Sequence, residues 1–337
     1  MDGLTDAPMR AVQGEIGAFT YAVSEFERVS ADVLSKKAIM RNVPELASGG
    51  LTPTGLPVQV QLLGGDPERM ALSALVAVEC GARAIDINFG CPAPTVNRHD
   101  GGATLLKHPQ RIRELVKAMR DAVPASIPVS AKLRLGWDNI DSIYENAEMA
   151  AEGGATWLTI HARTRVQGYQ PPVYWQPIGI VRERLGLPVV ANGDIWTLDD
   201  FRRCRDETGC IHYMLGRGAL ADPYLSHAVA EELGIGDGQV IPSNTPDFDW
   251  RPNLERLTRR TYDLEGHAPA LVGHSHPGNA SAKVLCRLKQ WLSIAWRFGV
   301  FPHFDAVKRA STVEELFDTL GRLYAASAPE DLVLCAA

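Results

Sequence analysis

The sequence has little cysteine and no long hydrophobic run, and these absences exclude several classes of protein. Its six cysteines, at positions 80, 91, 204, 210, 286 and 335, lie far apart and form no C-x-x-C pair. Neither a disulfide framework nor a cysteine-based zinc site is therefore expected. No run of about 18 apolar residues occurs, and no basic-then-apolar leader precedes the first helical pattern. We expect a cytoplasmic protein with no membrane span.

A strong excess of charge is also absent. The formal net charge is −6, and 45% of the 337 residues are hydrophobic, which is typical of a soluble chain that forms one large domain and a smaller one. Residues 249–322, however, contain eleven lysines and arginines and eight aspartates and glutamates, so this segment is basic, whereas the rest of the chain is acidic. Such segregation marks either a polyanion-binding face or an ordinary solvated helix surface.

Short apolar runs alternate with helical patterns over the first 233 residues, and this alternation predicts a parallel sheet. Asp66-Pro67 and Asp222-Pro223 are typical helix starts, with a capping carboxylate before a proline. The expected strands are 19–24, 58–62, 84–88, 129–135, 157–161, 188–192 and 212–215, and the expected helices are 67–80, 109–121, 139–152, 175–185, 197–207 and 219–233.

Seven strands are one fewer than a (β/α)₈ TIM barrel requires. Residues 1–8 have the composition of a loop that follows a first strand. We predict an α/β fold, a TIM barrel whose first strand lies upstream of Met1, because an open barrel would expose two strand edges. A naturally open barrel is the alternative.

After Leu233 the alternation stops. Residues 234–246 are rich in Gly, Pro, Ser and Asn, and helical patterns follow over 254–262, 280–298 and 304–323. We predict a barrel domain over 1–235, a linker over 236–248, a small all-α domain over 249–325 and a tail over 326–337. The histidines of 267–279 lack a carboxylate or cysteine at ligand spacing, so no metal site is expected.

The turn after the strand 84–88 is the most informative feature. Gly90 relaxes the backbone and Pro92 restricts it, so Cys91 is held on a loop beyond the carboxyl end of the strand. Barrel active sites are built from such loops. A functional cysteine is therefore preferred to a small buried hydrophobe.

Polar residues and glycines end the other strands as well. Ala191–Ile195 and Gly216–Gly218 follow the last two strands, where barrels bind phosphate, so a phosphorylated ligand is expected. Neither contains G-x-G-x-x-G, which argues against a Rossmann-type nicotinamide site. Lys132 suits either a Schiff base or donation to an electron-rich ring. The rim residues are Glu25, Arg28, Gln61, Asn88, Cys91, Lys132, Arg134, His161, Arg163, Asn192, Gly193, Asp194, Gly216, Arg217 and Gly218.

Taken in order, these motifs resemble those of the tRNA-dihydrouridine synthases. The segments that carry the resemblance are 1–6 (MDGLTD), 61–64 (QLLG), 86–92 (DINFGCP), 132–136 (KLRLG), 161–164 (HART), 191–194 (ANGD) and 216–218 (GRG). Residues 287–292 (RLKQWL) resemble the bacterial C-type subfamily. The family's first motif is normally preceded by a strand and an Ala-Pro, which this sequence lacks.

The resemblance implies an FMN enzyme, a monomer, that uses NADPH to reduce a D-loop uridine of tRNA, uridine 16, to 5,6-dihydrouridine. Hydride from the flavin would reach C6, and Cys91 would protonate C5. The resemblance implies FMN binding by Met1, Gln61, Lys132, His161, Asn192, Gly193, Asp194, Gly216 and Arg217, and substrate binding by Arg28, Asn88, Tyr169, Arg287, Lys289 and Lys308.

Two other functions share parts of this pattern. An FMN-dependent ene-reductase or dihydroorotate-type oxidoreductase would keep the phosphate rim and the lysine but would not need the basic helical segment. A non-catalytic tRNA-binding factor would keep the scaffold and would not depend on Cys91.

Overall fold

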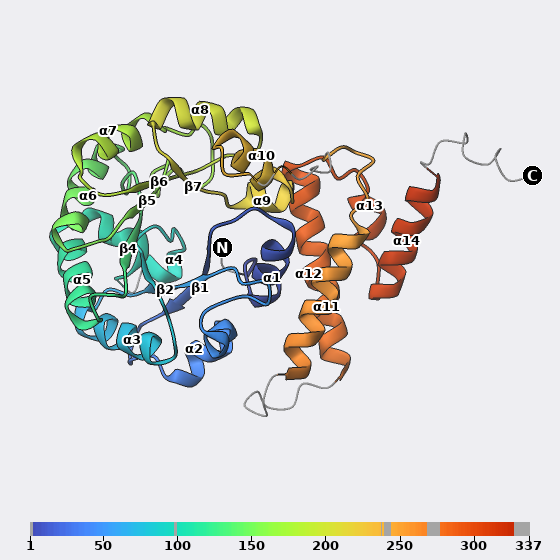
Figure 1. Ribbon diagram of the computed structural model, residues 1–337, viewed down its shortest axis with the longest axis horizontal. Coiled ribbons are helices and arrows are strands. Elements are labelled where there is room, and N and C mark those ends of the chain that lie inside the picture. The colour runs from blue at the N-terminus through green and yellow to red at the C-terminus, as the bar shows by residue number, and fades with distance from the viewer. Residues whose placement is uncertain (1–2, 98–99, 237, 239–243, 268–276, 327–337) are drawn as a thin grey trace, which may run out of the picture.

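Seven parallel strands form the centre of the larger part of the molecule. In the computed structural model, which describes residues 3–97, 100–236, 238, 244–267 and 277–326, the strands pair in chain order and curl into a barrel (Figure 1). All seven predicted strands are confirmed, with ends that shift by a few residues. They are β1 (Ala22–Arg28), β2 (Val58–Leu63), β3 (Ile85–Asn88), β4 (Val129–Arg134), β5 (Leu158–His161), β6 (Val189–Asn192) and β7 (His212–Met214).

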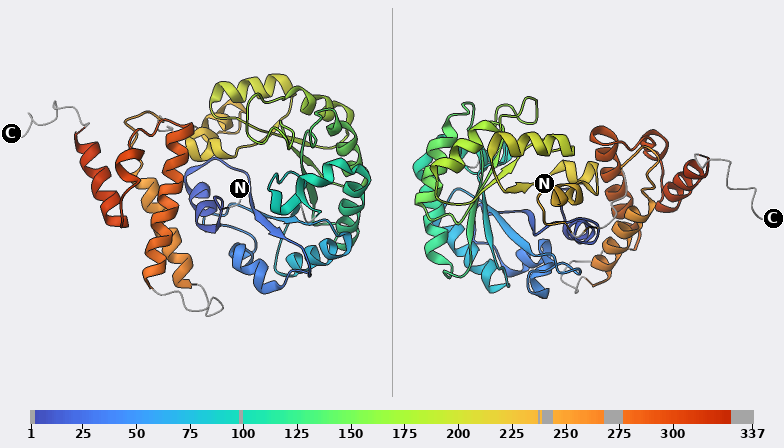
Figure 2. Two further views of the ribbon diagram at one scale, coloured as in Figure 1. Left: turned by 180° about the vertical axis from the view of Figure 1, so that it is seen from behind. Right: turned by 45° about the horizontal axis from the view of Figure 1, so that its top comes forward.

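Helices follow the strands and cover the outside of the sheet (Figures 1 and 2). Helix α3 (Pro67–Glu79) starts as predicted, because the Asp66 carboxylate accepts from the Arg69 N–H at 2.8 Å. The other helices of this part are α2 (Lys36–Asn42), η1 (Pro44–Ser48), α4 (Pro94–Asn97), η2 (Gly102–Lys107), α5 (Pro109–Ala122), α6 (Ser142–Glu152), α7 (Gln176–Arg184), α8 (Leu198–Thr208), α9 (Arg217–Ala221) and α10 (Leu225–Glu232).

The predicted helix over 219–233 is wrong in one respect, because it is divided into α9 and α10. The helix start predicted at Asp222-Pro223 lies close to the start of α10 at Leu225. The Asp222 carboxylate accepts from the Tyr224 N–H at 2.9 Å in the turn between the two helices. An Asp-Pro pair stabilises such a turn as readily as a helix start.

Strands β2 to β5 alternate apolar and polar side chains, whereas β6 is apolar up to Asn192. Their apolar residues, such as Val60 and Ile85, belong to the core that packs under the helices. The alternate residues point into the barrel. These inward residues are mostly polar, and each of Gln59, Gln61, Asp86, Ser130, Arg134, Thr159, His161 and Asn192 is 9% exposed or less. The interior is therefore a layer of polar groups, in contrast to the branched aliphatic residues that fill many barrels.

The sheet is open between its first and last strands. Within the described residues, β1 and β7 lie at the two ends of the strand order and do not pair. Before β1 the chain forms α1 (Ala7–Ile16), which Asp6 caps by accepting from the Met9 N–H at 3.2 Å. The expected loop therefore ends at Asp6, not at Pro8. A strand upstream of Met1 stays a prediction.

The described secondary-structure elements from residue 251 onward are all helices, as predicted. The expected single helix over 304–323 is interrupted, because the Thr312 hydroxyl accepts from the Glu315 N–H at 3.1 Å and starts a new helix. The four helices are α11 (Arg251–His267), α12 (Pro277–Phe298), α13 (Phe304–Val307) and α14 (Val313–Ala326).

The helical part shares a hydrophobic core with the barrel part. Trp250 and Trp291 pack in one cluster with Met9 of α1 and Leu220 of α9. The Trp291 indole also donates to the Leu220 carbonyl at 2.9 Å. The two parts are therefore joined by continuous apolar packing, and the domain limits named above stay a prediction.

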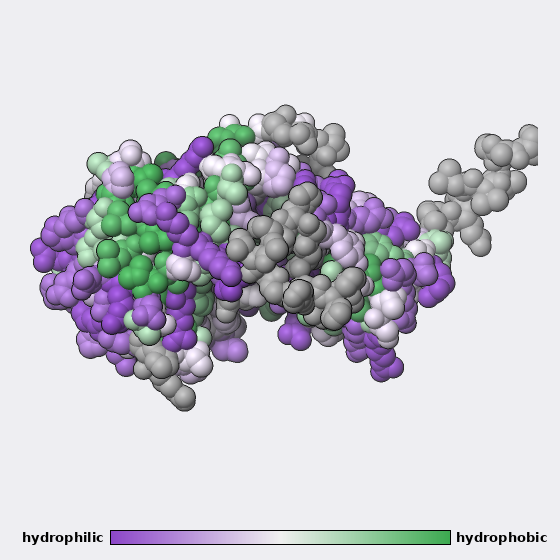
Figure 3. Space-filling view, turned by 90° about the horizontal axis from the view of Figure 1, so that it is seen from below, coloured by the Kyte–Doolittle hydropathy of each residue, from purple (hydrophilic) through white to green (hydrophobic). Residues whose placement is uncertain are grey.

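Seen from below, the face of the molecule is mostly hydrophilic, with an apolar area on the barrel part (Figure 3). None of the helices in the described ranges combines the length and the apolar character that crossing a membrane requires.

Candidate active site

A cavity of about 1060 Å³ lies at the carboxyl ends of the strands and continues along the open side of the sheet. Thirteen of the rim and site residues named above line it, although they come from six strands and their loops. They are Gln61, Asn88, Cys91, Lys132, Arg134, His161, Tyr169, Asn192, Gly193, Asp194, Gly216, Arg217 and Gly218. Parallel strands bring their carboxyl ends to one rim, which is why residues distant in sequence meet here.

Four of the predicted site residues lie away from this cavity. Arg28 is exposed at the end of β1 and donates to the Thr95 carbonyl at 3.3 Å. Lys308 is exposed and pairs with Asp305, whereas Lys289 is half-buried and donates to the Ala310 carbonyl at 2.5 Å. The fourth is Arg287. Met1 lies outside the described residues.

Arg287 ties the helical part to the segment before α1. It is 9% exposed, and its guanidinium donates to the Leu4 carbonyl at 2.9 Å and to the Asp6 carboxylate at 2.7 Å. It also donates to the Gly3 carbonyl. A guanidinium held in this way is already paired, so its predicted contact with the tRNA backbone would require this tie to open.

The turn that carries Cys91 is held from several sides. Asn88 Oδ1 accepts from the Gly90 N–H at 2.8 Å, and the Gly90 carbonyl accepts from Arg134 Nε at 2.8 Å. The Cys91 carbonyl accepts from the Ala103 N–H at 3.1 Å. Gly102 has a φ of +60°, and a Cβ there would lie 3.2 Å from Cys91 Cβ. The sulfur-bearing residue is therefore fixed at the cavity wall while staying partly exposed.

Polar side chains from three neighbouring strands face the cavity: Lys132 of β4, His161 of β5 and Asn192 of β6. Lys132 Nζ donates to Asn192 Oδ1 at 3.1 Å, and Asn192 Nδ2 donates to the Met214 carbonyl at 2.7 Å. Burial and the charge of Arg134 lower the pKa of Lys132, against the opposing effect of Asp86. These groups can present a cation and amide donors to an electron-rich ligand.

His161 is buried and neutral. Burial, and then the positive charges of Arg134 and Lys132, lower the pKa of its imidazole well below the ordinary value. Its Nδ1 atom is buried without a hydrogen-bond partner among the described residues. Because a buried polar atom is rarely left unpaired, this nitrogen suits contact with a ligand in the cavity.

The loops after β6 and β7 are closely packed against each other. A Cβ on Gly218 would lie 2.1 Å from the Ile195 carbonyl oxygen, so only glycine fits without moving the backbone. The Gly193 carbonyl accepts from the Trp175 indole at 3.0 Å. This packing places Gly193 and Gly216, whose backbones line the cavity, on one wall.

Two arginines and one carboxylate form an ion-pair cluster at this wall. Asp194 accepts from Arg163 at 2.8 Å and from Arg217 at 3.4 Å. Burial alone would raise the pKa of Asp194, but the hydrogen bond and charge of Arg163, with the charge of Arg217, lower it. The Arg163 side chain is fully buried and does not line the cavity, and its ion pair with Asp194 holds it in place. Arg217 is more exposed and does line the cavity.

Aromatic rings surround Arg217. Its guanidinium lies 4.5 Å from the Tyr169 ring centre, 4.9 Å from that of Trp196 and 5.1 Å from that of Phe298. Trp196 and Phe298 stack on each other at 4.5 Å. Phe298 is the last residue of α12, so the helical part contributes to the rim of the barrel.

The sequence interpretation missed two groups of residues here. Trp196 and Phe298 had no motif that would reveal them. The buried polar residues Gln59, Asp86 and Ser130, in contrast, had a visible signal, because the strict alternation of β2 to β4 is unusual for strands that are buried on both faces. Among the described residues, no group of three or more His, Cys, Asp or Glu side chains is placed to hold a metal ion.

The family comparison matches most of the chain. A model described as "Dihydrouridine synthase (Dus)" matches residues 1–237. A relative from Shewanella oneidensis, "tRNA-dihydrouridine(16) synthase", is 41% identical over 95% of both chains. A relative with the same name from Cupriavidus necator is 40% identical over 98% of both chains. Another, from Pseudomonas putida, is 46% identical over 88% of this chain and 86% of the relative.

Solved structures support the fold. Histamine dehydrogenase from Rhizobium sp. 4-9 matches with a TM-score of 0.51 at 15% identity, over 69% of this chain and 44% of that chain. A 2-naphthoyl-CoA reductase matches with a TM-score of 0.52 at 11% identity, over 68% of this chain and 47% of that chain. The chain thus spans less than half of either structure, and at these identities the likeness concerns the fold alone.

Proposed function

Because the chain belongs to the dihydrouridine synthase family, an oxidoreductase family, we propose that it reduces uridine 16 of tRNA to 5,6-dihydrouridine, with FMN as cofactor and NADPH as reductant. The observation that carries the proposal is the joint placement of Cys91, Asn88, Lys132 and Arg217 on one cavity. A thiol, an amide and two cations are what a pyrimidine and a phosphorylated ring cofactor need.

The residues present fit FMN. Lys132 and His161 offer a cation and an unpaired buried nitrogen to a polar heterocycle, and Gly193, Gly216 and Arg217 offer backbone groups and a guanidinium to its phosphate. A bound, reduced flavin supplies the hydride that C6 of uracil requires.

The chain's own residues supply the remaining chemistry. Saturating the C5–C6 bond of uracil adds one hydride and one proton, and the Cys91 thiol would give the proton to C5. Its thiolate is then reprotonated from water. Asn88 carries both a donor and an acceptor, so it can pair with the uracil edge and orient C5 toward the sulfur. Arg134 holds the turn through the Gly90 carbonyl.

FMN affinity is expected to fall as the pH rises through about 8. Burial and the charge of Arg134 lower the pKa of Lys132 to about 8, so its ammonium group loses its proton there. Below this pH the ammonium is charged and donates; above it a neutral amine has lost a charge-assisted hydrogen bond, and we expect affinity to fall about tenfold. Titration of FMN fluorescence in a Cys91→Ala background tests this, because the thiol then does not titrate. The Lys132→Arg variant should show no such fall.

A uridine of folded tRNA must leave its stack to reach the cavity, and phosphate contacts elsewhere compensate this cost. The Lys308→Glu variant is expected to weaken tRNA binding and to lower the slope of log affinity against log salt by about one. Lys117→Glu is the matched control, since Lys117 is also exposed and paired with a nearby aspartate but lies on α5 of the barrel. Equal effects of both variants would contradict a role for the helical part.

Mapping dihydrouridine in unmodified tRNA after incubation with the protein, FMN and NADPH tests the proposed function. We expect the modified base at position 16. Efficient reduction of quinones or small enones with no dihydrouridine in tRNA would instead indicate a small-molecule reductase. Action as a monomer in the cytoplasm stays a prediction.

A further inference from the structure

A buried carboxylate lies directly beneath the candidate site. Asp86 of β3 is 2% exposed and does not line the cavity. It lies in register with Gln61 of β2 on one side and Ser130 of β4 on the other. Asp86 Oδ2 accepts from Gln61 Nε2 at 2.7 Å, and Oδ1 accepts from Ser130 Oγ at 2.5 Å.

From Asp86, hydrogen bonds continue to the turn that carries Cys91. Gln61 Oε1 accepts from Asn88 Nδ2 at 2.8 Å, and Asn88 Oδ1 accepts from the Gly90 N–H at 2.8 Å. A relay of four groups, Asp86, Gln61, Asn88 and the Gly90 N–H, thus runs from the barrel interior to the residue before Cys91.

Each end of this relay has only one polarity. An ionised carboxylate only accepts, and a peptide N–H only donates. Between these ends, each amide has a single orientation that satisfies both of its neighbours. Turning the Gln61 amide would place its oxygen against the Asp86 carboxylate, and turning the Asn88 amide would place its NH₂ against the Gly90 N–H. Such mismatches among buried groups are strongly disfavoured.

Both carboxylate oxygens of Asp86 accept hydrogen bonds, one from Gln61 Nε2 and one from Ser130 Oγ, as the relay requires. Burial raises the pKa of Asp86 to about 6, and hydrogen bonds from Ser130 and Gln61, with the charge of Lys132, oppose a larger rise.

We propose that Asp86 is a positioning residue that sets the orientation of the Gln61 and Asn88 amides and, through Asn88, holds the turn that carries Cys91. The identity of the ligand that the two amides contact rests on the proposed function. The hydrogen bonds of the relay do not depend on it. Each amide keeps one further N–H and one further lone pair, and both side chains line the cavity. The order of donors and acceptors that a pyrimidine or a flavin would meet is thus set by a residue that touches neither.

The Asp86→Asn variant tests this inference. An asparagine can donate as well as accept, so the orientation of both amides is then fixed from the Gly90 end alone. The turned arrangement, in which the Gly90 N–H loses its acceptor, becomes more populated. We expect hydrogen exchange at the Gly90 amide, measured by NMR without tRNA or flavin, to be about tenfold faster or more. In turnover with tRNA, kcat should fall by a similar factor while KM for tRNA stays within about twofold.

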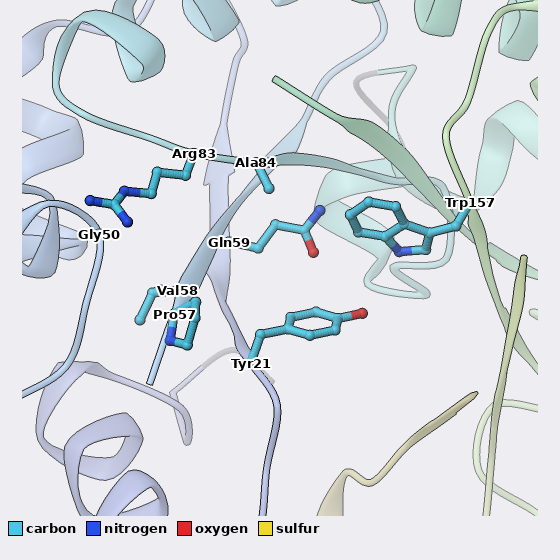
Figure 4. A pocket seen from close by; sticks show the side chains of 8 residues that line it. All are labelled: Tyr21, Gly50, Pro57, Val58, Gln59, Arg83, Ala84 and Trp157. Atoms are coloured by element: carbon cyan, nitrogen blue, oxygen red, sulfur yellow. The ribbon is translucent and has the colours of Figure 1, made fainter. Parts of the chain in front are cut away.

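Gln59→Met is the matched control. Gln59 is 3% exposed and its Nε2 donates to Ser130 Oγ at 2.9 Å, on the far side of Asp86. Its side chain lies between Tyr21 and Trp157 at a separate cavity of about 90 Å³ (Figure 4). This substitution removes a buried amide from the same network but leaves the relay intact, so exchange at Gly90 should not change.

A second variant keeps the test decisive if Asp86→Asn does not fold. Gln61→Met interrupts the relay and retains the carboxylate, so the same faster exchange at Gly90 is expected. Unchanged exchange in the folded relay variants, or equal acceleration in Gln59→Met, would overturn the inference. A protein with the expected exchange pattern that forms no dihydrouridine would contradict the proposed function and leave the relay standing.

Discussion

Replacing Cys91 with alanine is expected to lower kcat for dihydrouridine formation by about 10²- to 10⁴-fold, the range that a positioned general acid contributes. Cys91 lies on the cavity wall with its backbone held by Ala103 and its turn held by Asn88 and Arg134. The substitution removes the sulfur without disturbing those bonds. The rate is measured in single turnovers with unmodified tRNA.

Flavin content and reduction by NADPH provide the control for this variant, because neither depends on the proton donor. Both should match the unaltered protein. The rate of the Cys91→Ser variant should lie between those of the unaltered protein and Cys91→Ala, since a hydroxyl keeps the shape of the thiol but is a much weaker acid. A Cys91→Ala protein that forms dihydrouridine at the original rate would show that the proton comes from another group, or that the chain acts only as a binding factor.

The Gly218→Ala variant is expected to bind FMN about 5- to 150-fold more weakly, through a single added methyl group. A Cβ at Gly218 would lie 2.1 Å from the Ile195 carbonyl oxygen, and because this atom belongs to the backbone the loop itself must move. Overpacking of this kind costs about 1–3 kcal/mol, and each 1.4 kcal/mol borne by the bound state lowers FMN affinity about tenfold. The measurement is FMN affinity by fluorescence titration.

Gly186→Ala is the matched control, because Gly186 is exposed and a Cβ there would meet nothing within 4 Å. It should bind FMN as the unaltered protein does. A Gly218→Ala protein with unchanged FMN affinity would show that the loops after β6 and β7 do not form the phosphate site.

Much of the fold could be predicted because periodicity alone carries it. The seven strands and the helices α3, α5, α6, α7 and α8 follow from alternating apolar runs and helical spacing, whereas α2, α4, η1 and η2 were not predicted. The helix start at Ala7 was missed, because an Asp-x-Pro segment stabilises both a turn and a helix start. Only tertiary packing, such as that of Met9 against Trp250 and Trp291, decides between them.

The candidate site was predictable where motifs end strands and not where contacts cross the chain. Asn88, Cys91 and Lys132 follow from their place at the carboxyl ends of strands. Arg287 illustrates the opposite case, because a basic residue on a predicted helix does not reveal that it pairs with Asp6, 281 positions earlier. Long-range pairing of this sort depends on how the helical part packs on α1.

The most direct test of the account is anaerobic reoxidation of the NADPH-reduced protein by tRNA. The account predicts rapid reoxidation by unmodified tRNA, none by the same tRNA with cytidine at position 16, and a reaction slowed by at least about 10²-fold in Cys91→Ala. Equal reoxidation by both tRNAs, or an unchanged rate in Cys91→Ala, would contradict it.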